Sequence, residues 1–171
     1  MPFPNYFNIE SDIKLLHQHN VTGIFAEADQ SYPTADLNEL RAWLFANLAF
    51  DPSLNGTALM TEFLVGFYGR TGAPFVRKHM DIWRDAVLES TPPGKCTPAP
   101  GALICPRKLT KYQGPSAVWV TPEAVLASAV ALKTAVAHSQ PQYRPQLDRL
   151  WLTPSYLLLY LLLLFYECYA K

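Results

Sequence analysis

Apolar residues recur at steps of three and four along much of this chain, which is the spacing that one face of a helix requires. The clearest stretch ends at Asp51-Pro52, and its apolar positions are Leu37, Leu40, Leu44 and Leu48. A shorter stretch over residues 9–20 predicts a helix that Asn8 or Ser11 caps and Asn20 ends. We expect its inward positions to be Ile13, Leu15 and Leu16.

Two further helices are predicted on either side of Gly69. The first closes near this glycine and carries Leu59, Met60, Phe63, Leu64 and Phe67. We expect Pro74 to open the second, whose apolar side consists of Val76, Met80, Trp83 and Val87. The glycines at 66, 69 and 72 follow a helix rather than a strand, so helix termination explains them better than a nucleotide-binding loop.

The C-terminal part of the chain also has the pattern of helices. Thr121-Pro122-Glu123 is a strong helix start, and the apolar face that follows is Val125, Leu126, Ala129, Val130 and Leu132. Two helices over residues 143–151 and 156–169 are predicted beyond it, since Pro154 favours starting a new helix. The apolar run 156–166 is too short for a bilayer, which needs about 20 residues, so we expect a buried helix rather than a membrane anchor.

Residues 21–26 are rich in β-branched and aromatic side chains and form the best strand candidate. A single strand cannot satisfy its own backbone groups. Either the strand prediction is wrong or the neighbouring strands are absent from this chain, and we favour the second interpretation.

Seven of the 15 prolines lie between Thr91 and Pro122, which predicts a long loop or linker. The chain therefore divides into residues 1–90, a linker over 91–120 and a helical segment over 121–171. Cys96 and Cys105 both fall in the linker, where a disulfide and two free thiols are about equally expected.

The composition restricts the classes of function. The chain has 171 residues, 50% hydrophobic and 16% charged side chains, and a formal net charge of zero. The high hydrophobic fraction and zero net charge exclude disorder over most of the chain. Non-specific binding of nucleic acid is not expected either, because it needs a basic face. No Cys/His spacing resembles a metal site, and we expect neither a metal nor a cofactor. The first residues lack the pattern of a signal peptide, so a cytoplasmic location is expected if the chain is complete.

A string of motifs resembles a known family. It consists of GIFAE at residues 23–27, ELRAWL at 39–44, FDP at 50–52, EFL at 62–64 and FYG at 67–69. This order resembles the domain of unknown function numbered forty-eight thirty-eight, which is related to α-glucuronidase-like and hexosaminidase-like glycoside hydrolases. The resemblance covers residues 3–90 well and 117–160 loosely. Phe50 stands where the family usually has Trp, and Ala28 where it often has Gly.

The resemblance implies a mainly α fold, a helical bundle with one short strand, at the C-terminal end of a TIM-barrel-like unit. Most of the barrel would be absent. Glu27 and Asp29 would follow the end of a barrel strand, where catalytic acids lie, and they are our candidate catalytic residues. The two could lie near enough to act as a pair, but we favour a second acid on another strand that this chain does not contain. Tyr32 in the same loop is the candidate sugar-binding residue. The plainer alternative is that Glu27 is a solvated or helix-capping acid, although Asp36 is the better cap candidate.

Trp43 and Trp83 fall on apolar helix positions, so we expect them in the core rather than at a sugar site. The resemblance thus implies the C-terminal part of a glycoside-hydrolase-like domain that is inactive alone and binds carbohydrate only in the intact fold. The alternative is a helical interaction module whose apolar C-terminal helix, residues 157–165, binds a protein partner or, less expectedly, a membrane.

Overall fold

The protein is mainly helical in the described part of the computed structural model, which comprises residues 4–26, 36–90, 115 and 117–169. No strand occurs among these residues. The elements are η1 (Asn5–Phe7), α1 (Ile9–Gln18), α2 (Asn38–Phe50), α3 (Gly56–Glu89), α4 (Pro122–His138), η2 (Pro141–Tyr143) and α5 (Arg144–Tyr169). A mainly α fold is therefore confirmed, but a barrel origin is not tested by this arrangement.

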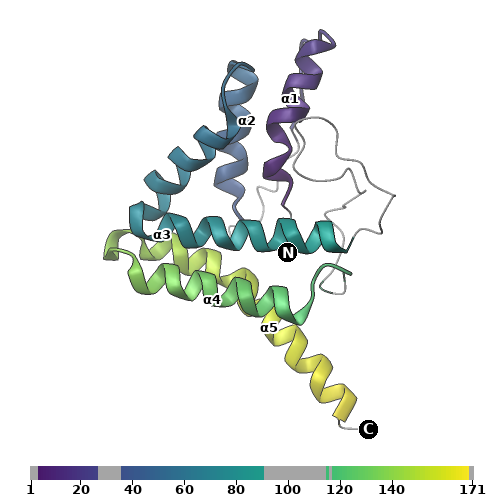
Figure 1. Cartoon of the computed structure of the whole chain (residues 1–171), viewed down its shortest axis with the longest axis vertical. Helices are drawn as coiled ribbons and strands as arrows, with labels where there is room; N and C mark the ends of the chain where they lie inside the picture. The colour runs from purple at the N-terminus through teal and green to yellow at the C-terminus, as the bar shows by residue number, and fades with distance from the viewer. Residues whose placement is uncertain (1–3, 27–35, 91–114, 116, 170–171) are drawn as a thin grey trace.

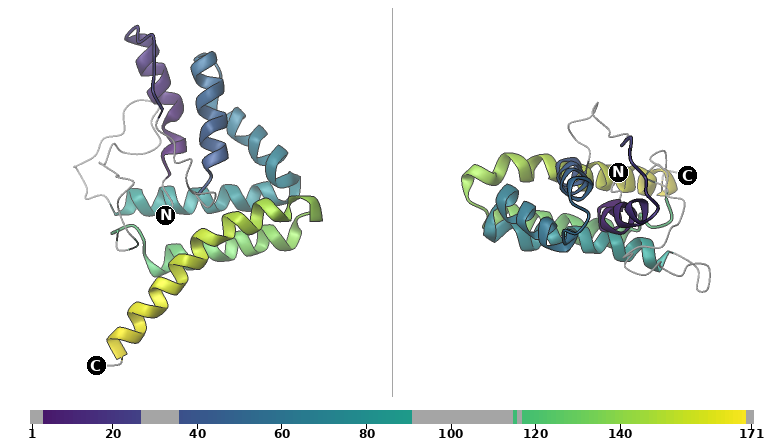
Figure 2. Two further views of the ribbon diagram at one scale, coloured as in Figure 1. Left: turned by 180° about the vertical axis from the view of Figure 1, so that it is seen from behind. Right: turned by 90° about the horizontal axis from the view of Figure 1, so that it is seen from above.

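The helices form two groups that meet along α3. The second half of α3 is a straight rod, with α4 and the first part of α5 packed below it in Figure 1. On its other side α1, α2 and the first half of α3 rise away from it, and α1 and α2 contact each other. The left view in Figure 2 shows the same separation of the two groups from behind. The second half of α3 is thus the common support of the molecule.

The core is built along this support. The predicted apolar side of the second half of α3 is confirmed, since Val76, Met80, Trp83 and Val87 are all fully buried. The α2 stripe is confirmed as well, with Leu40, Leu44 and Leu48 at most 1% exposed.

Four predicted inward positions are wrong. Leu15 is 54% exposed because α1 is packed mainly against α2 and only Ile13 of α1 is buried. Leu126 and Val130 lie on the outer side of α4 and are 56% and 63% exposed. Trp43 is 36% exposed at the edge of α2, where its ring lies 6.2 Å from that of Phe63. In each case the pattern identified a helix but assigned too wide an inward face.

Residues 21–26 do not form the predicted strand. They are neither helical nor paired, and the structure describes no neighbouring strand for them. Their large side chains are open to solvent, with Val21 42%, Ile24 43% and Phe25 92% exposed. A β-rich composition is not sufficient here because an extended segment becomes a strand only when another strand takes up its backbone N–H and C=O groups.

Gly69 bends α3 into two halves, as its predicted helix-ending role requires. Its backbone has φ 77° and ψ 157°, a region that side-chain-bearing residues essentially do not adopt. The helix resumes directly after this glycine, so the prediction that Pro74 opens the second half is wrong. Pro74 lies inside the first turns after the bend, where few helical hydrogen bonds depend on its missing N–H.

The start of α4 follows its local sequence. The backbone N–H of Ala124 donates to Thr121 Oγ1 at 3.2 Å, and Pro122 takes the first helical position. The predicted cap is confirmed. At α1, by contrast, the Asn8 side chain makes no capping bond, and Ser11 Oγ donates to the Asn8 carbonyl at 2.8 Å.

The last helix is longer and less buried than predicted. α5 continues through Pro154 instead of breaking there, and it contains both predicted helices. Its first part is buried on α4 as far as Leu157, but the remainder points away from the bundle (Figures 1 and 2). Leu159, Leu162 and Leu163 are 62–65% exposed, so the expectation of a buried helix is wrong for this segment. By length and composition alone, the stretch Pro141–Leu164 would suffice to cross a membrane.

Candidate functional site

The sequence-predicted site residues Glu27, Asp29 and Tyr32 lie within 27–35, outside the described residues. The same holds for Cys96 and Cys105. The structure describes both ends of the segment that carries the two acids. Phe25, just before it, is largely exposed, whereas Asp36, just after it, is only 3% exposed. The contacts of Asp36 are therefore the first feature of the candidate site that the structure describes.

Asp36 is held by a buried polar chain that links three parts of the fold. His79 Nε2 lies 3.2 Å from Asp36 Oδ1, and His79 Nδ1 lies 2.8 Å from Ser128 Oγ. His79 and Ser128 are fully buried, on α3 and α4 respectively. Because an ionised carboxylate can only accept, Nε2 donates to Asp36, and in the neutral imidazole Nδ1 accepts from the Ser128 hydroxyl. We call these three residues the buried triad.

Arg41 extends the anchoring of Asp36 through the backbone. Its Nη1 donates to the Asp36 carbonyl, and its Nε donates to Asn5 Oδ1 at 2.6 Å. The guanidinium also lies over the ring of Tyr6, 5.5 Å from the centroid. One arginine on α2 thus connects the backbone of Asp36 to η1.

The electrostatics favour an ionised Asp36 in spite of its burial. Burial alone raises the pKa of this carboxyl, but the hydrogen bond and electrostatic interaction with His79, together with the charge of Arg41, outweigh it, so that its pKa lies below the ordinary value. For Tyr6, burial raises the pKa of the hydroxyl well above 10, and the negative charge of Asp36 raises it further. The site thus contains a buried carboxylate beside a neutral phenol.

We expect the stability of the protein to fall as the pH drops below about 4, the ordinary pKa of aspartate. A carboxyl whose pKa is lower in the folded state stabilises the fold above its unfolded pKa, and this contribution is lost as the pH falls through the folded pKa. Asp36→Asn keeps an acceptor for His79 but removes the titration. Thermal unfolding midpoints measured across this acidic range should decline less steeply in the variant than in the natural chain. Equal slopes would contradict the assignment.

The buried triad has the residue types of a hydrolase triad, but a substrate cannot reach it. Serine nucleophiles act on a substrate that reaches the hydroxyl and on an oxyanion that nearby donors stabilise. Ser128 lies in the middle of α4 with no exposed surface, and His79 is equally closed. Neither residue lines the two surface hollows described below. The triad therefore works as a structural connection between Asp36, just before α2, and the helices α3 and α4.

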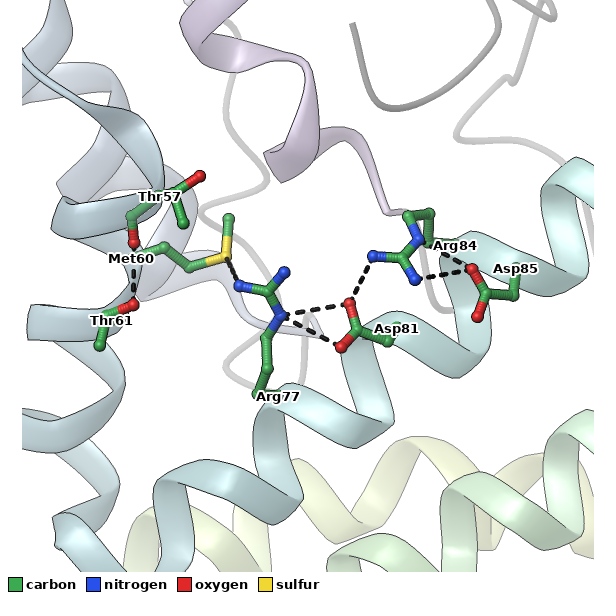
Figure 3. Close-up of polar contacts among 7 residues, drawn as sticks. All are labelled: Thr57, Met60, Thr61, Arg77, Asp81, Arg84 and Asp85. Carbon is green, nitrogen blue, oxygen red and sulfur yellow. Dashed lines mark hydrogen bonds and ion pairs between the residues drawn. The ribbon is translucent and has the colours of Figure 1, made fainter.

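A second polar cluster holds the N-terminal turn on α3 (Figure 3). Arg77 Nε donates to both oxygens of Asp81 at 3.1 and 3.2 Å, and Arg84 Nη1 donates to Asp81 Oδ1 at 2.6 Å. Arg84 also pairs with Asp85. The two guanidiniums lie 5.4 and 5.2 Å from the centroid of the Phe7 ring, which is 4% exposed. The cluster thus fixes η1 by cation–π contacts and burial.

Two surface hollows are large enough to receive small groups. One, of about 220 Å³, lies in the bend of α3 and is lined mostly by apolar atoms, with Arg70 and Arg77 as its charged residues. The other, of about 110 Å³, contains Glu10 as its only acid. Neither offers the pair of carboxylates that glycoside hydrolysis requires. Among the described residues no group of three His, Cys, Asp or Glu side chains is arranged to hold a metal ion.

Sequence reasoning missed the buried triad. No role was assigned to His79 from the sequence, and Asp36 was expected to cap the helix, but the N-cap of α2 is Leu37 and makes no side-chain capping bond. Asp36 turns inward to His79 instead. The three residues are 43 and 49 positions apart, and no spacing rule connects them. The only signals in the sequence were a histidine among the apolar positions of one helix and a serine among those of another.

The fold and these clusters define an all-helical unit whose described polar groups serve to hold its parts together. The family model described as domain of unknown function (DUF4838) matches residues 1–81. This confirms the predicted resemblance over that part of the chain, which includes η1, α1, α2 and most of α3. No curated protein and no solved structure matches the chain.

Proposed function

We propose that this chain is the C-terminal part of a glycoside-hydrolase-like domain and that it is catalytically inactive without the rest of a barrel. The observation that carries the proposal is the match of residues 1–81 to a family that we relate to these hydrolases. Glu27 and Asp29 are the proposed catalytic acids of the intact fold, and Tyr32 is the proposed sugar-binding residue.

The buried triad supports this proposal by its position. It anchors Asp36 directly after the segment with the two acids, which gives that segment a rigid base on α3 and α4. The exposed side chains before it, Val21, Ile24 and Phe25, support the same interpretation because they would be covered by neighbouring barrel strands. The two sets of residues suit a unit that completes a larger fold.

The proposal is tested by assaying the full chain on aryl glycosides and aryl uronosides beside a known glycosidase. We expect no turnover, because the described structure supplies no barrel strands to complete a sugar site around Glu27 and Asp29. Clear turnover that disappears in Glu27→Gln would overturn the inactive assignment. In the transcript, an upstream reading frame with βα repeats would support the link to a barrel, and unrelated upstream coding sequence would count against it.

A second candidate function rests on the exposed part of α5. Leu158 and Leu161 still pack partly on the core, but Leu159, Leu162 and Leu163 are 62–65% exposed and uncovered in the described structure, which favours an interaction module that uses this helix. A chain truncated after residue 161 should keep the unfolding temperature of the full chain, because Leu157 is the last fully buried side chain among the described ones of α5 and Leu161 the last that packs partly on the core. It should also lose association in light scattering and vesicle flotation. Unfolding of the truncated chain would show that the segment is core and would contradict this function.

A further inference from the structure

The exposed part of α5 carries a regular apolar stripe. Its members alternate in steps of four and three residues, and each is 47–72% exposed: Leu152, Tyr156, Leu159, Leu163 and Tyr166. This seven-residue repeat is the pattern by which one helix packs along another in a coiled coil. We call these five residues the outer stripe.

The bundle occupies the opposite face of the same helix. Leu150, Thr153 and Leu157 point into the interface with α4 and are at most 6% exposed. Since consecutive helix positions are about 100° apart, the outer stripe lies roughly opposite these residues. The packing among the described residues therefore leaves the outer stripe free for a partner.

A lipid bilayer is a less suitable partner for the outer stripe than another helix. The part of α5 beyond Leu157 has 12 residues and is about 18 Å long, whereas the hydrocarbon layer is about 30 Å thick. The preceding part of the apolar stretch is already packed on α4, with Leu147 and Leu157 fully buried. Spanning a bilayer would separate α4 from α5 and expose this core.

A second copy of the chain is a suitable partner for the outer stripe, both in its charge and in the area that it can bury. No charged residue occurs between Arg149 and Glu167, so two copies of the stripe can meet without like-charge repulsion or buried ions. Five side chains that each bury on the order of 100 Å² would give about 1,000 Å² over both copies, at the lower limit of a specific interface.

We propose that the outer stripe of α5 pairs with the same stripe of a second copy, forming a weak homodimer through helix–helix packing. This inference rests on the second candidate function and names its partner. The bundle keeps its own fold in the dimer, because the stripe does not contribute to the buried side of α5.

The test compares Leu163→Glu with Leu162→Glu in the full chain by sedimentation equilibrium, with a reducing agent present so that cysteines cannot link the copies. The two leucines are adjacent and 64% and 65% exposed, but only Leu163 belongs to the outer stripe. Leu163→Glu should weaken dimerisation at least about tenfold because it buries a charge in the seam. Leu162→Glu should change it by less than about threefold.

Three results would overturn the proposal. The natural chain could be a monomer at all concentrations, both variants could lose dimerisation equally, or Leu163→Glu could leave the dimer unchanged. Flotation with phosphatidylcholine vesicles distinguishes failure of the homodimer proposal from failure of the second candidate function. A monomer that floats with the vesicles overturns self-association but retains an interaction role for α5, whereas a monomer that does not float overturns both.

Discussion

Replacing His79 by alanine is expected to lower the free energy of unfolding by about 3–5 kcal/mol, because it leaves the carboxylate of Asp36 buried without its partner. His79 provides the side-chain hydrogen bond to Asp36 Oδ1, and the other oxygen of Asp36 is buried with no hydrogen-bond partner among the described residues. Without the imidazole the carboxylate would be buried beside a new cavity. Urea unfolding followed by circular dichroism measures the change.

Two further variants make this prediction sharper. His17 is exposed near the end of α1, so His17→Ala should change the stability by no more than about 0.5 kcal/mol. Ser128→Ala removes the hydroxyl from the other imidazole nitrogen and should cost an intermediate amount, about 1–3 kcal/mol, since it leaves a buried neutral acceptor unpaired. If His79→Ala costs no more than His17→Ala, the triad is not a structural connection.

Replacing Gly69 by alanine is expected to destabilise the fold by about 2–5 kcal/mol. The backbone at this position lies in a glycine-only region that costs other residues about 1–3 kcal/mol. An added Cβ would also lie 2.6 Å from two carbons of the Tyr143 ring, so η2 would have to move or the bend would have to open. The variant should also fold to a less compact shape, because the two halves of α3 set the angle between the two groups of helices.

Gly66 provides the matched control for this prediction. It lies one turn earlier in α3, and a Cβ built there meets nothing within 4 Å. Gly66→Ala should therefore be neutral or raise the stability by up to about 1 kcal/mol, as alanine favours the helix. Thermal unfolding and small-angle X-ray scattering of both variants check the pair. Equal effects at the two positions would show that the bend does not depend on Gly69.

The elements that could be predicted from the sequence are those with local causes. The α2 stripe, the ending at Asp51-Pro52 and the start at Thr121-Pro122 each depend on neighbouring residues and are confirmed. Pro154 shows the limit of such reasoning. It was expected to begin a new helix, but Leu150 and Leu157 on either side of it are buried against the bundle and keep α5 continuous. Packing over two turns outweighs one missing hydrogen bond.

The strand prediction was wrong, and the buried triad was missed, for another reason. Both features depend on groups that are distant in the sequence. Residues 21–26 needed a neighbouring strand, which the described structure does not supply. Asp36 needed a histidine 43 positions away, and the fold alone brought the two within 3.2 Å. The candidate acids Glu27 and Asp29, with Tyr32, stay predictions because they lie outside the described residues.

By itself, the sequence of this protein determined which stretches are helical, where α3 bends and which family the N-terminal part of the chain resembles. Helical periodicity, caps, proline and glycine act over a few residues, and motif order is a property of the chain alone. Only the tertiary structure decided which apolar faces are covered and which polar side chains meet. Burial depends on what each helix is packed against, and this is why Trp83 is buried, Leu163 is exposed and His79 lies between Asp36 and Ser128.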